Sequence, residues 1–350
     1  MTTTLQWLFV AGLACLPFVI DDQYFIHVLI MMGIFTIAAM SLNLLLGYTG
    51  QLSLGHVAFF GIGAYASALV SLGFDLQLTD SYTFVFSPKP AWFALLCGVV
   101  VAGLFGWFVG KLSFRVRGAY FVIVTISFAE VVRLVALNWI DLTEGPMALN
   151  NIPSLAFSIP GFEDGPLQRK IANYYIVLAL AVASFAIIQR IVQSRLGRAM
   201  VALRENESLA KSIGIDVTRY LVLAAVVSAA IAGGAGGLYA HYVRIVDPDV
   251  FLFIYTVTMV IMVVSGGKGT LAGPIVGGII FGLLPEFLRG HTLPEVQWII
   301  YGALMILIVF FLPEGIVPAV KKGWAAIQKN RGNGMTPKVS LDRGVREQEG

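Results

Sequence analysis

Ten long apolar stretches alternate with shorter polar segments along the 350-residue chain. A helix needs about 20 mainly apolar residues to cross the hydrocarbon core of a membrane, and most of these stretches approach that length. The pattern therefore predicts an all-α polytopic membrane protein, with about ten transmembrane helices in its first 312 residues. The predicted spans are residues 5–20, 24–46, 57–73, 91–110, 119–138, 173–192, 220–242, 251–264, 271–288 and 295–312.

The composition agrees with a chain that lies mostly in lipid. Hydrophobic residues make up 58% of the sequence and charged residues 12%, whereas soluble domains hold about 25% charged residues. The net charge of +3 is small and no basic patch forms, so no nucleic-acid partner is expected. Cys15 and Cys97 lie inside apolar stretches and the histidines stand apart, so we expect no metal and no other cofactor. The N-terminus lacks the positive charge of a secretion signal, so residues 5–20 are expected to remain as a membrane helix.

The lysines and arginines indicate how the chain is oriented. One set of loops, together with the C-terminal tail, carries 17 of them and the opposite loops carry five. Because positive loops stay in the cytoplasm, both termini and the segment 193–219 are predicted to be cytoplasmic. The segment 139–172 is then an external loop, and its length indicates a surface for a partner. The polar tail, residues 313–350, is predicted to be cytoplasmic and disordered.

The segment 193–219 carries eight charges in 27 residues and must lie in water. Its spacing predicts a short helix that Asn206 caps and that Gly214 ends by taking a positive φ. Glu207 and Lys211 have the i,i+4 spacing that favours a helical ion pair. One face of this helix is expected to hold Leu209, Ala210 and Ile213. Two interpretations stay open: a docking helix for a partner, and a solvated loop with one helical turn.

Residues 47–56 are rich in glycine and polar side chains, yet no charged residue interrupts them. Unwound backbone at membrane depth is tolerated only against protein or a water-filled cavity, so this stretch is predicted to lie inside the protein. It either lies beside the route of a substrate or is a plain glycine-rich turn. The candidate residues for a translocation path are Asn43, Gln51, Ser53, His56 and Glu130.

Glu130 and Arg133 stand three residues apart in the fifth predicted span. Glu130 lies about 16 Å from the inner end of that helix, near the bilayer centre. An unpaired charge there is costly, so each side chain is expected to neutralise the other or to meet another helix. Two interpretations stay open: an internal structural ion pair, and a wall of the path for a zwitterionic substrate.

Three segments carry a resemblance to a known family. The stretch Ser-Leu-Asn-Leu-Leu-Leu-Gly-Tyr-Thr-Gly-Gln-Leu-Ser-Leu-Gly-His at residues 41–56, with its continuation to residue 65, resembles the signature of LivM-type permeases. These are one of two membrane subunits of branched-chain amino acid ABC importers. Residues 117–121 and 264–274 fit the same family. Residues 205–214 resemble the EAA loop of ABC-importer permeases, in which an acidic residue, an alanine and a glycine dock on the ATPase subunit.

The resemblance implies a helical ABC-importer permease domain, residues 1–312, in the inner membrane of a bacterial-type cell. It implies a hydrophobic amino acid as substrate. The implied partners are a second permease of LivH type, two cytoplasmic ATPase subunits and a periplasmic binding protein, besides membrane lipid. The implied ATPase-coupling residues are Arg204, Glu205, Glu207, Ala210 and Gly214. The chain departs from the family at Glu144 and Ala148, where glycine is usual, and this puts the exact substrate in doubt.

The sequence contains no constellation suited to catalysis. A phosphate-binding loop needs G-x-x-x-x-G-K-[ST], and the nearest match, Gly267-Lys268, has Met262 in place of the first glycine and Gly269 in the last position. The chain is therefore predicted not to be an enzyme, and partner subunits would hydrolyse ATP. The alternatives are a permease of the same family for urea or short amides, a membrane scaffold, and an ion-coupled secondary transporter with carboxylates near the midplane.

Overall fold

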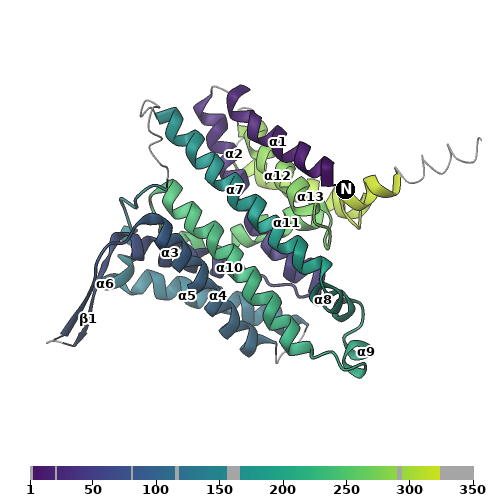
Figure 1. The fold of residues 1–350 in the computed structure, drawn as a ribbon, viewed down its shortest axis with the longest axis horizontal. Helices are drawn as coiled ribbons and strands as arrows, with labels where there is room; N and C mark the ends of the chain where they lie inside the picture. The colour runs from purple at the N-terminus through teal and green to yellow at the C-terminus, as the bar shows by residue number, and fades with distance from the viewer. Residues whose placement is uncertain are drawn as a thin grey trace, which may run out of the picture.

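The computed structural model describes residues 3–19, 22–79, 82–114, 118–155, 166–289 and 294–323, which form a bundle of long helices (Figure 1). Ten helices coincide with the predicted spans, and their ends lie within three residues of the predicted ends except at the start of α7, seven residues early. Their bounds are α1 Thr3–Val19, α2 Gln23–Asn43, α3 Val57–Leu72, α4 Ala91–Ser113, α5 Ala119–Asn138, α7 Pro166–Gln193, α10 Val217–Val243, α11 Phe253–Gly266, α12 Gly273–Arg289 and α13 Pro294–Phe311.

These helices make the chain an all-α polytopic membrane protein. Among the described residues, five helices are long and apolar enough to cross a membrane, namely α2 with its continuation, α4, α5, α7 and α10. Shorter apolar helices of 10–17 residues lie within α1, α3, α11 and α12. The count of ten spans and the cytoplasmic placement of both termini stay predictions.

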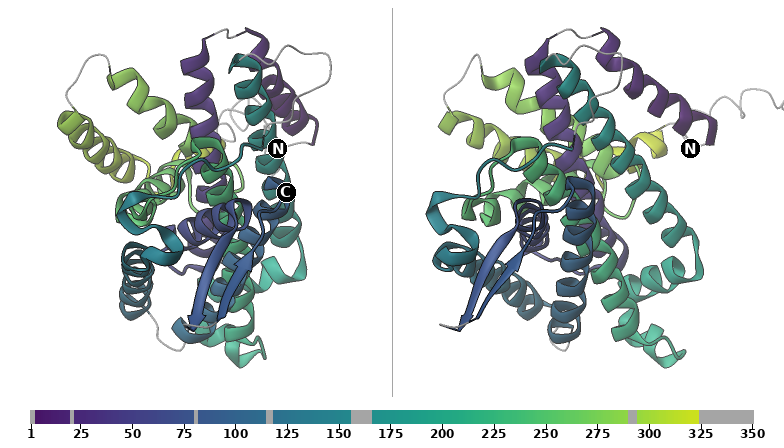
Figure 2. Two further views of the ribbon diagram at one scale, coloured as in Figure 1. Left: turned by 90° about the vertical axis from the view of Figure 1, so that its left-hand side faces the viewer. Right: turned by 60° about the vertical axis from the view of Figure 1, so that its left-hand side comes forward.

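One β-hairpin departs from the all-helical prediction. Strands β1, Phe74–Thr79, and β2, Tyr82–Phe86, pair antiparallel between α3 and α4 and project from the bundle (Figures 1 and 2). The rings of Phe74 and Phe86 stack across the pair with centroids 5.3 Å apart. Aromatic and β-branched residues favour such strands, and this local signal was hidden between two strongly apolar helices.

The core of the bundle is built around α10, which packs against α2, α3 and α4. In its most apolar stretch, 72% of the residues of α10 are buried by the rest of the chain. Glycines allow this close packing: a Cβ atom on Gly236 would collide with the carbonyl of Phe60, and one on Gly63 would collide with the backbone of Gly233. Small residues let membrane helices approach closely where lipid supplies no hydrophobic drive for association.

The described part of the predicted external loop is held against α10. It contains the short helices α6, Ile140–Thr143, and η2, Gly145–Met147. After them, Leu149 pairs with Val246 as a β-bridge. His241 accepts a hydrogen bond from the Ser67 hydroxyl at 2.8 Å and donates to the Pro153 carbonyl at 2.6 Å. The expected long connection is thus ordered over residues 139–155, while residues 156–165 lie outside the described part.

At the predicted cytoplasmic end, α2 continues as the π-helix η1, Leu44–Thr49. The backbone therefore leaves the helix at Gly50, whose φ is 74°, three residues later than the predicted start of the unwound stretch. Two short helices follow α7: α8, Arg195–Glu205, and α9, Glu207–Ser212. Past α13, residues 316–323 are helical where a disordered tail was predicted, and Pro318 packs against Gly267. The rest of the predicted tail lies outside the described residues.

Candidate functional site

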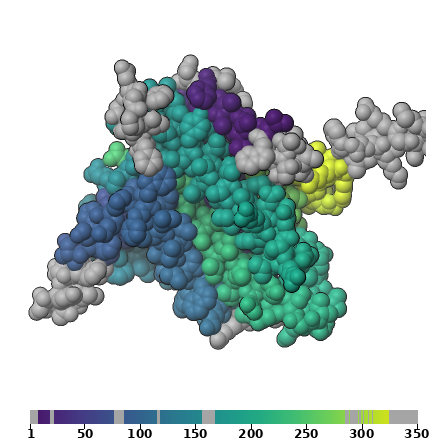
Figure 3. Space-filling view, in the orientation of Figure 1, coloured from purple at the N-terminus to yellow at the C-terminus, as the bar shows by residue number. Residues whose placement is uncertain are grey.

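The segment predicted to couple to an ATPase forms α8 and α9, which make one corner of the molecular surface (Figure 3). The predicted cap of α9 is confirmed, because the side-chain oxygen of Asn206 accepts a 3.0 Å hydrogen bond from the N–H of Leu209. The predicted end is confirmed as well. Gly214 has a φ of 88°, its N–H donates to the Lys211 carbonyl, and the next N–H donates to the Ala210 carbonyl. This pattern is the glycine-ended helix terminus that satisfies the last carbonyls.

The apolar face of α9 differs from the predicted one. Leu209 and Ile213 are 62% and 71% exposed, whereas Ala210 is 2% exposed and packs against the chain. The prediction that these three residues share one face is wrong for Ala210. Residues four apart lie above one another on a helix, while the next residue is turned by about 100°. The exposed apolar residues here are therefore Leu209 of α9 and Ile213, which directly follows the helix.

Arg204, at the end of α8, points back into the bundle. Its Nη1 donates a 2.7 Å hydrogen bond to the carbonyl of Gly47, and its Nη2 forms a 2.6 Å ion pair with Glu205. The Glu205 side chain is 67% exposed. Glu207 is partly buried at the start of α9, and Gly214 faces open space. The five residues of the predicted coupling loop are thus divided, with Arg204 and Ala210 directed inward and Glu205 and Gly214 outward.

Two segments far apart in the sequence meet beside Arg204, and we call residues 43–50 and 267–270 the glycine junction. The side-chain amide of Asn43 joins them: its Nδ2 donates to the Thr270 carbonyl and its Oδ1 accepts from the Gly269 N–H, both at 2.9 Å. A Cβ atom on Gly47 would collide with the backbone of Gly269. Asn43 is 2% exposed and holds the two segments of the junction together, and its place in a translocation path stays a prediction.

The other polar residues of the predicted path lie inside the chain beyond the junction. Ser53 is 2% exposed, His56 is fully buried and Gln51 is half-buried, so the prediction of an interior stretch is confirmed at these positions. His56 Nε2 lies 2.8 Å from the Ser41 hydroxyl, and because that hydroxyl donates to a backbone carbonyl, Nε2 carries the proton. The Ser228 hydroxyl binds the Ser41 carbonyl at 2.6 Å. A role of these residues in transport stays a prediction.

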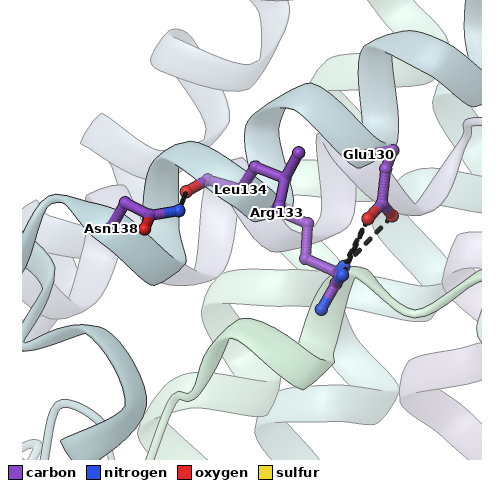
Figure 4. Close-up of polar contacts among 4 residues, drawn as sticks. All are labelled: Glu130, Arg133, Leu134 and Asn138. Atoms are coloured by element: carbon purple, nitrogen blue, oxygen red, sulfur yellow. Dashed lines mark hydrogen bonds and ion pairs between the residues drawn. The ribbon is translucent and has the colours of Figure 1, made fainter.

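Glu130 lies elsewhere, on the outer face of α5. It forms a bidentate ion pair with Arg133, the shortest distance being 2.7 Å (Figure 4). The Glu130 side chain is 52% exposed and that of Arg133 is 24% exposed. The expected pair therefore exists, but the expectation that it is internal to the chain is wrong. The isolated sequence shows the charges and their spacing, whereas the side of the helix that faces the bundle follows only from the packing.

Two further polar residues share the face of Glu130, and the sequence analysis missed them. Ser127 and Asn138 are exposed, and both fall on the helical repeat of three and four residues that runs through Glu130. Asn138 donates a 2.8 Å hydrogen bond to the carbonyl of Leu134 on the same face (Figure 4). We call Ser127, Glu130, Arg133 and Asn138 the polar stripe. Its periodicity was visible in the sequence and would have marked it.

The structure contains nothing that would hold a metal in its described part, where no group of three His, Cys, Asp or Glu side chains is close enough. The structure has three separate features: α9 with its exposed Leu209, the glycine junction beside Arg204 of α8, and the polar stripe on α5.

Comparison with known proteins places the chain in a family of membrane transport components. The family profile described as branched-chain amino acid transport system / permease component matches residues 24–309. The high-affinity branched-chain amino acid transport system permease protein LivM of Escherichia coli is 31% identical over 91% of this chain and 77% of its own length. LivM of Salmonella typhimurium shows the same values. LivH of Escherichia coli is 26% identical, over 82% of this chain and 93% of its own. No solved structure gives a significant match.

Proposed function

Since the chain belongs to the family of permease components of branched-chain amino acid transport systems, we propose that it forms one membrane subunit of an ATP-driven importer for these amino acids. Similarity to LivM over 91% of the chain supports this role, and similarity to LivH supports a second permease as partner. The chain itself supplies helices and contacts, and ATP would be hydrolysed by two cytoplasmic subunits.

The position that we propose for the translocation path rests on one observation, the ion pair on the outer face of α5. A charged side chain near the centre of a membrane helix is costly when it faces lipid. Glu130 and Arg133 neutralise each other, yet their side chains remain 52% and 24% exposed in the isolated chain. Ser127 and Asn138 extend this polar character along the same face. We therefore assign the polar stripe to the translocation path, with the second permease closing the opposite side.

The chemistry of the stripe suits the proposed substrate. A branched-chain amino acid has an ammonium group, a carboxylate and an apolar side chain. Glu130 and Arg133 offer one carboxylate and one guanidinium within one helical turn, while exposed Ile123 and Leu134 on the same helix offer apolar surface. Weak contacts of this kind are sufficient for a path, because a substrate must leave each site as easily as it enters.

The two ends of the bundle supply the remaining contacts. We assign Leu209 and Ile213 of α9 to the contact with an ATPase subunit, since exposed apolar residues beside charged ones mark interaction surfaces. On the opposite end, α6 and η2 expose Ile140 and Met147, 63% and 80% accessible, and we assign this surface to a periplasmic binding protein. Closure of the ATPases would shift the bundle between two states, inward-open and outward-open.

The test is transport by the native complex in liposomes. The complex would be purified through a tag on this chain, and ATP-driven uptake of labelled leucine, isoleucine and valine would be measured, with urea and acetamide as competing solutes. We expect uptake that requires ATP hydrolysis and that neither urea nor acetamide inhibits. Uptake that persists without ATP and stops when ion gradients are dissipated would contradict the proposal. Accumulation of urea instead of leucine would reassign the substrate.

A further inference from the structure

Arg204 fits a notch whose walls are glycines. Its Nη1 binds the carbonyl of Gly47 at 2.7 Å. A Cβ atom on Gly269 would lie 2.6 Å from this same Nη1, and one on Gly50 would lie 3.1 Å from Arg204 Cγ. A side chain at either position would crowd the arginine, so Gly269 leaves room for the guanidinium and Gly50 leaves room for the stem of the side chain. The Arg204 side chain is still 34% exposed, and the glycines contact it on the side that faces η1 and the segment around Gly269.

The notch connects α8 to both halves of the glycine junction. Arg204 contacts Gly47 in η1, and its guanidinium lies against Gly269 in the other segment. The amide of Asn43 already ties these two segments together through two hydrogen bonds of 2.9 Å. Arg204, the end of α2 and the segment that precedes α12 are therefore joined by one set of contacts. These two helices also pack against each other along the bundle.

Glu205 orients the guanidinium from the opposite side. It accepts hydrogen bonds from Nε at 3.2 Å and from Nη2 at 2.6 Å, so that Nη1 remains for Gly47. α8 is itself held to the bundle, because Met200 and Leu203 are buried at 0% and 5% exposure. Only Asn206 separates α8 from α9, whose Leu209 faces outward. The chain thus offers a short and stiff connection from the outer surface to the membrane helices.

We propose that Arg204 is the positioning residue through which movement of α8 and α9 reaches the membrane bundle. This inference rests on the proposed function, in which an ATPase subunit moves α9. According to this inference, Arg204 makes no contact with the ATPase. Arg204 transmits the movement to Gly47 and, through Asn43, to the segment around Gly269. The π-helix at the contact point supports this role, since such irregular turns occur frequently at functional sites.

The experiment compares Arg204→Gln with Arg198→Gln in the purified native complex. Arg198 is an exposed arginine of the same helix, and its Nη1 donates to the Gln193 carbonyl at 3.4 Å. For Arg204→Gln we expect the maximal rate of ATP-driven leucine uptake to fall about tenfold or more, the factor expected from losing a charged hydrogen bond. The half-saturating leucine concentration and the amount of co-purified ATPase should stay unchanged. Arg198→Gln should change none of these quantities.

A second variant disturbs the same contact from the glycine side. Gly269→Ala keeps Arg204 but places a methyl group against its Nη1 and against the Gly47 carbonyl, and because the φ of Gly269 is 73° its thermal unfolding is measured beside uptake. We expect the same loss of maximal rate, and the double variant should lose no more than either single variant, because both remove one contact. Additive losses would overturn the inference, as would normal uptake in Arg204→Gln. Loss of the ATPase from the Arg204→Gln complex would make Arg204 a docking residue instead. If the unaltered complex shows no ATP-driven uptake, the proposed function itself fails.

Discussion

α10 and α5 are both apolar helices of membrane length, yet the chain uses them in opposite ways. In the most apolar stretch of each, 72% of α10 is buried by the rest of the chain and only 22% of α5. α10 meets its neighbours through glycines and alanines. α5 lies at the edge of the bundle in the left view of Figure 2. It turns one buried edge to α3, and the residues of the polar stripe lie on its more exposed side.

The different burial of α10 and α5 reflects two different structural requirements, although both helices have apolar sequences. A helix at the centre of a bundle is selected for close packing, so it holds small residues and almost no charge. A helix that carries charges outward in a membrane needs water or a second protein beside it. The comparison therefore predicts that substitutions in α10 act on folding and that substitutions on the outer face of α5 act on transport.

Gly236→Ala in α10 should have the largest effect on stability. Its Cβ atom would collide with the backbone carbonyl of Phe60, which no rotamer change relieves. We expect the free energy of unfolding to fall by about 3 kcal/mol, at the upper end for overpacking. Thermal unfolding in detergent would measure it. Gly302→Ala in α13 is the matched control, since nothing lies within 4 Å of its Cβ position. Equal stability of the two variants would contradict the prediction that close packing at Gly236 stabilises the bundle.

Leu209→Asp extends the comparison to the surface helix α9. Because Leu209 is 62% exposed, the variant should fold normally. Its affinity for the co-purified ATPase should fall about 30-fold, the loss expected from an interface anchor of about 2 kcal/mol. Ser208→Asp adds the same charge at the neighbouring exposed position and should leave binding intact. Binding curves from labelled ATPase would decide, and a similar loss in both variants would point to charge rather than to an apolar contact.

Glu130→Gln tests the outer face of α5 directly. We expect leucine uptake to fall about tenfold, while the free energy of unfolding changes by no more than about 0.5 kcal/mol, as for other exposed ion pairs. Glu314→Gln is the control, because Glu314 forms an exposed pair of 2.6 Å with Lys322 outside the spans. Liposome transport and thermal unfolding measured on the same samples separate the two effects. An unstable but fully active Glu130→Gln variant would assign the pair a structural role.

Gly214→Ala should have the smallest effect. The φ of Gly214 is 88°, a conformation that costs an alanine roughly 1 kcal/mol, although nothing lies within 4 Å of its Cβ position. We expect faster hydrogen exchange in α9 and little change elsewhere. Gly302→Ala again serves as the control, because its backbone is helical. Unchanged exchange in α9 would show that the glycine is not needed to end this helix.

Most of the architecture could be predicted from local patterns. The helix α5 begins and ends at the predicted residues, because a lipid-spanning helix depends on its own apolar length. The cap at Asn206 and the end at Gly214 are also local, since each involves atoms a few residues apart. The hairpin at β1 and β2 was missed because a short amphipathic strand pair gives a far weaker signal than a membrane helix.

The candidate site shows the same distinction between local patterns, which could be predicted, and contacts between distant segments, which could not. Asn43 was singled out for its polarity in an apolar span, but its partners Gly269 and Thr270 lie more than 200 residues away in the sequence. Arg204 was assigned to the loop that couples to an ATPase, which stays a prediction, and its contact with Gly47 was not foreseen. Ala210 was placed with the exposed residues of α9 and is buried. Each of these outcomes depends on contacts between segments, which periodicity within one segment does not contain.

By itself, the sequence determined that this chain enters a membrane and where its helices lie, and it indicated a capped charged helix that is predicted to stand outside the lipid. These properties follow from the free energy of transferring each segment between water and hydrocarbon, which is set by the residues of that segment. Only the tertiary structure decided which side of each helix is covered. It placed Arg204 inside a glycine notch and left the Glu130–Arg133 pair facing outward, because a side chain's surroundings depend on which helices pack against it.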